Sequence, residues 1–287
     1  MVNTLNRKKD FTLNINGIKM TGVAYGDSRH PPMLALHGWL DNAASFALLA
    51  EQLPNRYLIA LDFIGHGKSA HRCATTPYYI WDNVTEVYLA MQQLKLHSVD
   101  VIGHSMGASI AMLFAASFPS KVEKLYLIEG IAPLHYDVQQ LPALMASAIR
   151  KRVRTVPKTP KRYPSVDALI KARMNARFPV SERAAQLLVE RGSLEQEGEF
   201  IWSNDPALLL PSINRMCPEQ IMSFLHTVEA KVHLFLAQEG LLSEQWQLYI
   251  QQLQKIQIDT FTGNHHLHMQ ESGAIAISKA ISAAPAG

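Results

Sequence analysis

Short apolar segments alternate with longer amphipathic segments toward both ends of the chain. The apolar segments have the length of buried strands, and the amphipathic ones repeat apolar residues at helical spacing. Strands are predicted at residues 33–37, 57–62, 99–103, 124–129, 231–237 and 256–261, with helices at 44–53, 78–94 and 105–118. This alternation predicts an α/β fold in which helices cover both faces of a mostly parallel sheet.

An antiparallel hairpin is expected before the first of these strands. Residues 11–15 and 18–25 both read as strands, and Asn16-Gly17 separates them. An Asn-Gly pair favours a two-residue turn, because both positions of that turn need a positive φ. No internal repeat is visible in the sequence.

The middle of the chain follows a different pattern. Between about residues 134 and 210 the strands stop, and three stretches, 141–154, 165–178 and 181–194, have the composition and spacing of helices. We therefore predict a core formed by residues 1–133 and 211–287, with residues 134–210 inserted as a helical cap over the sheet.

Charge is concentrated in this middle segment. Residues 150–177 contain ten Lys or Arg and a single acid, Asp167. A solvated face is the favoured interpretation, and attraction of anionic substrates or surfaces is the alternative. No aromatic residues interleave with these charges in a nucleic-acid-binding motif, so a nucleic-acid partner is not expected.

Composition narrows the remaining possibilities. The chain has 287 residues, 48% of them hydrophobic, and a formal net charge of +3. The first twenty residues lack the apolar segment of a signal peptide, and no apolar run is long enough to span a membrane. A cytoplasmic location is expected. Cys73 and Cys217 have neither disulfide nor metal-ligand spacing, so neither a metal nor a cofactor is predicted.

The segment from Val99 to Phe118 carries the strongest indication of chemistry. Residues 103–107 read GHSMG, after an apolar strand and before an apolar helix. A serine in the middle of GxSxG at a strand-to-helix turn is exposed as a nucleophile, and the flanking glycines let strand and helix approach each other. Ser105 is therefore the predicted nucleophile, flanked by Gly103 and Gly107.

Two backbone N–H groups are candidates for an oxyanion hole. Trp39 follows the strand at 33–37, and Met106 follows the nucleophile at the start of the next helix. Loops and helix ends in these positions direct N–H groups at a developing negative charge. Only the main chain of Trp39 and Met106 is needed for this role.

Four motifs together resemble the α/β-hydrolase superfamily. HGW at 37–39, DxxGHGxS at 62–69, GHSMG at 103–107 and GNHHLH at 263–268 occur in the family's order. Within the superfamily, HGWLDNAASF at 37–46 and LIEGIAPL at 127–134 look most like the serine hydrolase-like proteins. The resemblance implies an α/β-hydrolase fold. DxxGHGxS, although it contains Asp, His and Ser, is expected to be structural, with Asp62 and Ser69 bonded to nearby backbone.

The resemblance also implies a catalytic base in the late histidine-rich loop. By similarity to the family pattern, His265 takes this position, and Asn264 replaces the usual second glycine. His266 is the alternative, because a shift of one residue would exchange the two roles. His268 is expected to pack.

The acid that orients the base is less obvious. Most relatives carry an Asp shortly after the strand at 231–237, where this sequence reads Gln238-Glu239-Gly240. Glu129 follows an earlier strand, 24 residues after the nucleophile, much as one branch of the haloalkane dehalogenases carries its acid. A carboxylate there can reach the same histidine from a neighbouring strand end. Glu129 is the preferred acid, with Glu239 as the alternative.

These residues predict a cofactor-independent serine hydrolase, a carboxylesterase-type enzyme that cleaves small carboxylic esters or thioesters through an acyl-enzyme. Hydrolysis of amide or carbon–carbon bonds by the same residues is one alternative. The other is a non-catalytic protein that binds a small ligand in the same pocket, because a fold does not dictate its function.

Overall fold

The computed structural model describes residues 8–73, 76–154, 160–241 and 244–283. An eight-stranded sheet forms its centre, in the order β1-β2-β4-β3-β5-β6-β9-β10. The strands are β1 (Lys9–Ile15), β2 (Ile18–Tyr25), β3 (Pro32–Leu36), β4 (Tyr57–Asp62), β5 (Val99–His104), β6 (Val122–Ile128), β9 (Lys231–Glu239) and β10 (Ile256–Asn264). Within the described part of this sheet, only the β1–β2 and β2–β4 pairs are antiparallel. The predicted mostly parallel sheet is confirmed.

The opening hairpin has the predicted turn. Asn16 and Gly17 have φ values of 51° and 88°, and both signs match a two-residue hairpin turn. The side-chain oxygen of Asn14 accepts a hydrogen bond from the Gly17 N–H at 2.7 Å. Local sequence therefore sets the register of β1 against β2.

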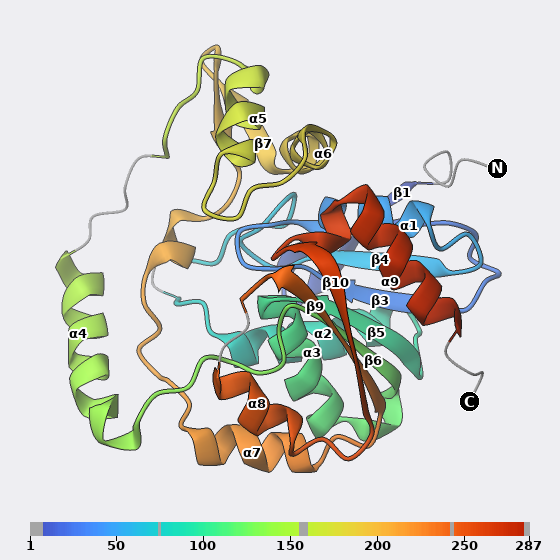
Figure 1. Cartoon of the computed structure of the whole chain (residues 1–287). Helices are drawn as coiled ribbons and strands as arrows, with labels where there is room; N and C mark the ends of the chain where they lie inside the picture. The colour runs from blue at the N-terminus through green and yellow to red at the C-terminus, as the bar shows by residue number, and fades with distance from the viewer. Residues whose placement is uncertain (1–7, 74–75, 155–159, 242–243, 284–287) are drawn as a thin grey trace.

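Helices cover both faces of the sheet, as the sequence predicts (Figure 1). One face carries α2 (Ile80–Gln93), α3 (Met106–Ser117), α7 (Pro218–His226) and α8 (Glu244–Ile250). The other carries α1 (Ala47–Glu51), preceded by the 3₁₀ turn η2 (Ala43–Phe46), and α9 (Glu271–Ala283). Further 3₁₀ turns are η3 (Pro119–Lys121), η4 (Val138–Gln140) and η6 (Leu267–Met269).

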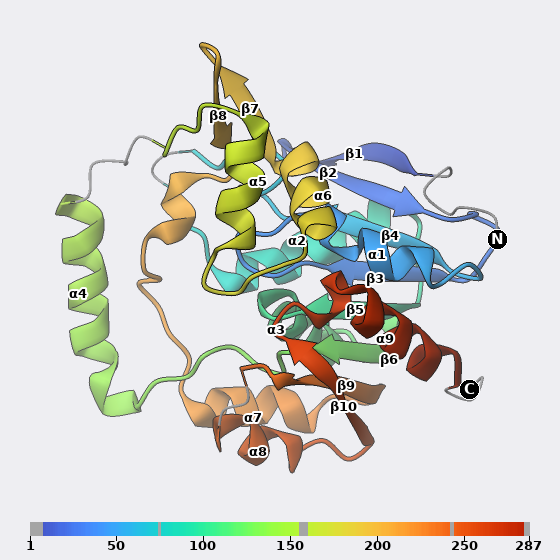
Figure 2. The same ribbon diagram turned by 45° about the horizontal axis from the view of Figure 1, so that its top comes forward.

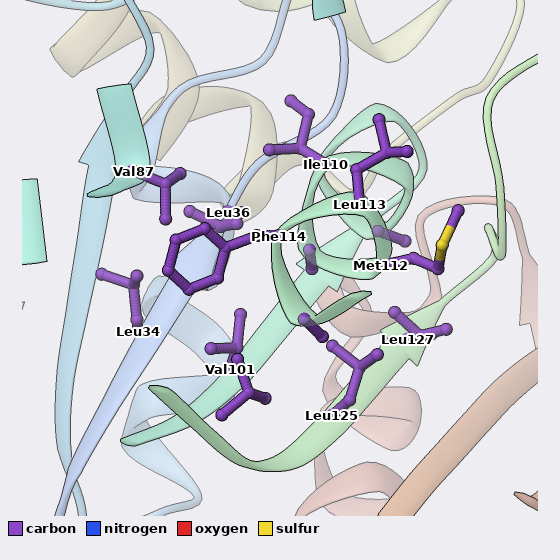
Figure 3. Close-up of a cluster of buried hydrophobic side chains, with 14 of the residues drawn as sticks. Leu34, Leu36, Val87, Val101, Ile110, Met112, Leu113, Phe114, Leu125 and Leu127 are labelled. Carbon is purple, nitrogen blue, oxygen red and sulfur yellow. The ribbon is translucent and has the colours of Figure 1, made fainter. Parts of the chain in front are cut away.

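The centre of the core lies under α3. Residues 107–116 of this helix are all buried, and the Phe114 ring lies among side chains of β3, α2 and β5, including Leu34, Val87 and Val101 (Figure 3). Burying this many apolar groups holds α3 firmly on the sheet, because each methylene removed from water contributes about 0.8 kcal/mol. The turn before α3 thus has a rigid support on its helical side.

The middle segment contains the three predicted helices, α4 (Leu141–Arg154), α5 (Val166–Met174) and α6 (Glu182–Gly192). The second helix ends at Met174 rather than at residue 178. The third ends at Gly192 rather than at residue 194, because Ser193 begins a hairpin of β7 (Ser193–Gln196) and β8 (Glu199–Trp202). The turn residues of this hairpin, Glu197 and Gly198, both have positive φ, as a two-residue hairpin turn requires. The 3₁₀ turn η5 (Pro206–Leu209) follows.

Helix α4 differs from its neighbours in its packing. It lies apart from α5 and α6 in both views (Figures 1 and 2), and only its Ala148 is buried. Helix α6 instead packs Ala184, Ala185 and Leu188 against the core cluster on the α1 and α9 face. Among the residues described, no helix is long and apolar enough to cross a membrane.

The DxxGHGxS loop has the structural role expected from its sequence. Asp62 is fully buried, and its carboxylate accepts hydrogen bonds from the Ala43 N–H at 2.8 Å and the Thr21 hydroxyl at 2.7 Å. Ser69 donates to the Asp62 carbonyl oxygen at 2.7 Å. Arg191 of α6 also donates to both Asp62 oxygens at 3.0 Å, so this loop ties the middle segment to the sheet.

Candidate active site

Ser105 occupies a strained turn at the C-terminal end of the central strand β5. It has φ 52° and ψ −113°, a conformation that non-glycine residues adopt rarely and mostly at functional sites. A Cβ atom on Gly103 would lie 2.4 Å from the Gly107 carbonyl oxygen, and one on Gly107 would lie 2.0 Å from the Leu36 carbonyl oxygen. Only glycine fits at these two positions, as the sequence predicts.

His265 is held in the loop directly after β10. Its backbone carbonyl accepts a hydrogen bond from His104 Nε2 at 2.9 Å, and its buried ring packs against the rings of His104 and Phe178, each with a centroid separation of 4.7 Å. Its Nδ1 lies 3.3 Å from Glu129 Oε2. Three neighbours therefore fix the position of this imidazole.

Glu129 follows β6 and is buried, with 1% of its surface exposed. Its Oε1 accepts a hydrogen bond from the Ala237 N–H, and its Oε2 accepts one from the Leu241 N–H, both at 2.7 Å. Its backbone has φ 49°, again unusual for a side chain of this size. The two N–H groups hold the carboxylate at His265 in one orientation.

Gly240 accounts for the departure of this sequence from the common pattern. A Cβ atom built on Gly240 would lie 2.2 and 2.3 Å from the two carboxylate oxygens of Glu129. The Glu129 carboxylate thus occupies the space that a side chain at position 240 would need. Glu239 is exposed at the end of β9. The structure brings Glu129, and not Glu239, to His265.

Of the two predicted oxyanion donors, Met106 directly follows Ser105, and Trp39 lines the same cavity as Ser105. Met106 is the first residue of α3, where a helix has no internal acceptor for its N–H groups. Trp39 lies in the loop after β3, and the buried side chain of His37 holds this loop in place. His37 Nε2 accepts a hydrogen bond from the Phe63 N–H at 3.1 Å, and its Nδ1 donates to the Gly38 carbonyl oxygen at 2.7 Å.

A cavity of about 700 Å³ opens in front of Ser105. Ser105, His265 and Trp39 line it together with Tyr163, Phe178 and Trp202 from the middle segment. This volume lies within the range of small-molecule sites. The middle segment therefore supplies much of the surface that a bound molecule would contact.

His266 also lines this cavity and belongs to a second cluster of charged and polar side chains. Its Nε2 lies 3.3 Å from an Asp41 oxygen and 3.1 Å from the Arg173 guanidinium, which also donates to Asp41 at 3.2 Å. Burial opposes ionisation of Asp41, but His266, Arg173 and His104 outweigh it and hold the pKa of Asp41 well below its usual value. His266 thus pairs with Asp41, whereas His265 pairs with Glu129.

The same cluster has donor atoms suited to a cation, but its charge does not fit one. Ligand atoms of Asp41, His104 and His266 lie within 4.8 Å of one another. The guanidinium of Arg173 already contacts two of these three side chains. Burial and the neighbouring histidines lower the pKa of His104, and they lower that of His268 to about 3, so both rings are neutral at pH 7.

Sequence reasoning missed Asp41, Arg173 and Phe178 as parts of this site. Asp41 lies within the HGWLDNAASF segment, four residues after His37, and that position was the available signal. Arg173 and Phe178 come from the middle segment, where no motif points to them.

Comparison with known proteins identifies the family. Residues 31–203 match the family described as alpha/beta hydrolase fold. A serine hydrolase-like protein of Danio rerio is 31% identical over 93% of this chain and 86% of its own length. The human serine hydrolase-like protein 2 is 29% identical over 88% and 87% of the two chains.

Solved structures show the same architecture. A hypothetical protein from Pseudomonas aeruginosa PAO1 superposes with a TM-score of 0.91 at 33% identity, covering 96% of this chain and 98% of its own. A thioesterase domain from the curacin biosynthetic pathway shares the fold, with a TM-score of 0.86 at 21% identity over 96% and 99%. The chain therefore belongs to the α/β-hydrolase fold family and groups there with the serine hydrolase-like proteins.

Proposed function

We propose that this protein is a serine hydrolase that cleaves carboxylic esters or thioesters, with Ser105 as nucleophile, His265 as base and Glu129 as orienting acid. The observation that carries the proposal is the buried Glu129 carboxylate, fixed by two backbone N–H groups at 3.3 Å from His265 Nδ1. Such an acid beside a histidine, in a cavity that also exposes a serine on a strained turn, is the arrangement that activates a hydroxyl.

The proposed reaction starts with a proton transfer. His265 Nδ1–H donates to Glu129, so the lone pair lies on Nε2, which takes the proton of Ser105 as its oxygen attacks the substrate carbonyl. The N–H groups of Trp39 and Met106 stabilise the resulting oxyanion. His265 then protonates the leaving alcohol or thiol, and the acyl group stays on Ser105. Water, deprotonated by His265, releases the acid.

The shape and lining of the cavity favour a small acyl substrate. Tyr163, Phe178 and Trp202 provide an aromatic wall of the cavity that Ser105 also lines, which suits the apolar part of an ester or thioester. Amide and carbon–carbon bond hydrolysis pass through a similar oxyanion, so they remain the alternatives within the same mechanism. A non-catalytic binding protein would keep the cavity without a reactive serine.

A fluorophosphonate probe combined with ester turnover tests the proposal. The wild-type protein should be labelled at Ser105 and should hydrolyse p-nitrophenyl butyrate. Ser105→Ala removes only the nucleophilic oxygen, so kcat should fall on the order of 10⁴- to 10⁶-fold while the circular dichroism spectrum is unchanged. A folded wild-type protein that is neither labelled nor active would support the binding-protein alternative. An alanine variant that keeps more than a few per cent of kcat would contradict the mechanism.

A further inference from the structure

The charged side chains around the cavity do not balance. Three cations, Lys161, Arg173 and Arg177, line it together with two acids, Asp41 and Asp205. Asp41 is paired with Arg173 at 3.2 Å. Asp205 accepts hydrogen bonds from the Tyr78 hydroxyl at 2.6 Å and from the Ala207 N–H at 2.8 Å, which fixes its carboxylate as the cap of η5.

Lys161 and Arg177 therefore remain as cations without an acidic partner in the part of the chain that the structure describes. Each instead lies over an aromatic ring that lines the same cavity. Lys161 Nζ is 5.0 Å from the centre of the Tyr163 ring, and Arg177 Cζ is 5.3 Å from the centre of the Phe178 ring. Cation–π contacts of this kind orient a charged group without neutralising it.

The position of Arg177 relates it to the reacting atoms. The Arg177 guanidinium lies over the Phe178 ring, and this ring also packs on His265 at a centroid separation of 4.7 Å. The Phe178 ring thus lies between Arg177 and the proposed base. The Arg177 side chain is exposed. An anionic group bound there would lie at the mouth of the cavity, at a distance from the scissile carbonyl.

We propose that the site selects acyl substrates with an apolar body and a distal anionic group, a carboxylate or phosphate, which Arg177 and Lys161 bind at the cavity mouth. The inference rests on the proposed serine hydrolase function and names its substrate class. The aromatic wall accommodates the apolar body. Because both cations are exposed, they keep much of their hydration when an anion binds, so the desolvation cost is small.

Two pairs of substrates distinguish the sources of the anion. Mono-p-nitrophenyl suberate carries a carboxylate at the acyl end, and its methyl ester is the neutral counterpart. Octanoyl-coenzyme A carries phosphates on the leaving group, and octanoyl-N-acetylcysteamine is its neutral counterpart. We measure the preference as kcat/KM for the anionic substrate divided by kcat/KM for its neutral counterpart. For the pair whose anion the site binds, this ratio should be on the order of tenfold, and added salt should reduce it.

Matched variants test the two cations. Lys161→Gln combined with Arg177→Gln should remove most of that preference. Arg162→Gln is the control for a lost positive charge in the same segment. It removes one charge, but Arg162 pairs with Glu197 and Glu199 at 3.1 and 3.3 Å and is not among the cavity-lining residues. The control variant should keep the wild-type ratio.

Two kinetic results would overturn the proposal. One is a double variant whose kcat/KM ratios are unchanged for both substrate pairs. The other is a control variant that lowers the ratio as much as the double variant does, which would mean that the overall positive charge of the segment, and not these two side chains, attracts the anion. Neutral esters report on the serine mechanism separately, since their Ser105-dependent turnover does not require the cations. Calorimetry of monomethyl suberate against dimethyl suberate on the Ser105→Ala protein supplies a test without turnover: equal affinities would contradict the proposal.

Discussion

Helices α3 and α4 are of similar length, but their environments are opposite. Residues 107–116 of α3 are all buried beneath the Ser105 turn, whereas α4 buries only Ala148 and leaves Val153 82% exposed. The first is held by packing that tolerates little change. The second is free to vary. The contrast separates the firmly supported turn of Ser105 from α4, which contributes none of the described residues that line the cavity.

The middle segment is held on the core by polar contacts as well as by the packing of α6. Arg173 of α5 donates to Asp41, and Arg191 of α6 donates to Asp62. The side chain of Asn204 also donates to the Leu40 carbonyl oxygen at 2.8 Å. The position of α5 and α6 therefore depends partly on individual polar contacts, whereas the position of α3 depends on a whole apolar surface.

The largest expected effect lies on the packed side, in the histidine-rich loop. His265→Ala removes the proposed base, so kcat for a p-nitrophenyl ester should fall on the order of 10⁴- to 10⁶-fold, as for a lost triad member. His266→Ala should be clearly milder, because His266 pairs with Asp41 and Arg173. Steady-state kinetics of both purified variants decide between them. The opposite order would assign the base to His266.

The choice of acid is the next largest effect. Glu129→Gln keeps the shape of the side chain but no longer holds the imidazole in its required tautomer, so kcat should drop roughly 10³- to 10⁴-fold. Glu239→Gln should remain near wild type, since Glu239 is exposed and Glu129 occupies the space beside Gly240. A crippled Glu239→Gln beside a nearly normal Glu129→Gln would reverse the assignment.

The sequence predicts the packed region far better than the middle segment. Strand periodicity, the Asn16-Gly17 turn and GxSxG each arise from local geometry, and residues close in sequence are sufficient to specify them. The sequence favours Glu129 over Glu239 as the acid but does not decide between them, because the choice depends on how β6 and β9 lie side by side. The contacts of Arg173 and Phe178 depend on how the middle segment folds back over the sheet, and no periodicity encodes that.

Two substitutions, one on α3 and one on α4, compare how much each helix contributes to the free energy of unfolding. Phe114→Ala leaves a cavity among the side chains around it in Figure 3, and it should lower the free energy of unfolding by about 3–5 kcal/mol. Val153→Ser on exposed α4 should change it by less than about 0.5 kcal/mol. Urea denaturation followed by circular dichroism compares them. Similar losses for both would mean that α4 is packed in solution.

The smallest effect separates the regions by pH. Burial lowers the pKa of His37, His66, His104 and His268 in the core, to about 3 for His66 and His268. Below pH 6.5 the unfolded chain binds protons that these folded rings do not, so stability present at neutral pH is lost as the pH falls. The middle segment, residues 134–210, contains a single histidine, His135, and its Lys and Arg do not titrate in this range.

Two buried carboxyls in the core act in the opposite direction. Burial raises the pKa of Glu86 to about 7, so between pH 4.5 and 7 the folded state holds a proton that the unfolded state lacks. Burial also raises the pKa of Asp100. Four histidines outweigh these two carboxyls, and each net proton contributes a slope of about 1.4 kcal/mol per pH unit. Urea denaturation at pH 7.5 and 5.5 should therefore show lower stability at pH 5.5. His66→Gln should reduce that difference, because it removes one of the four protons taken up on unfolding. Stability that stays level or rises at pH 5.5 would show that the buried histidines are protonated in the folded core.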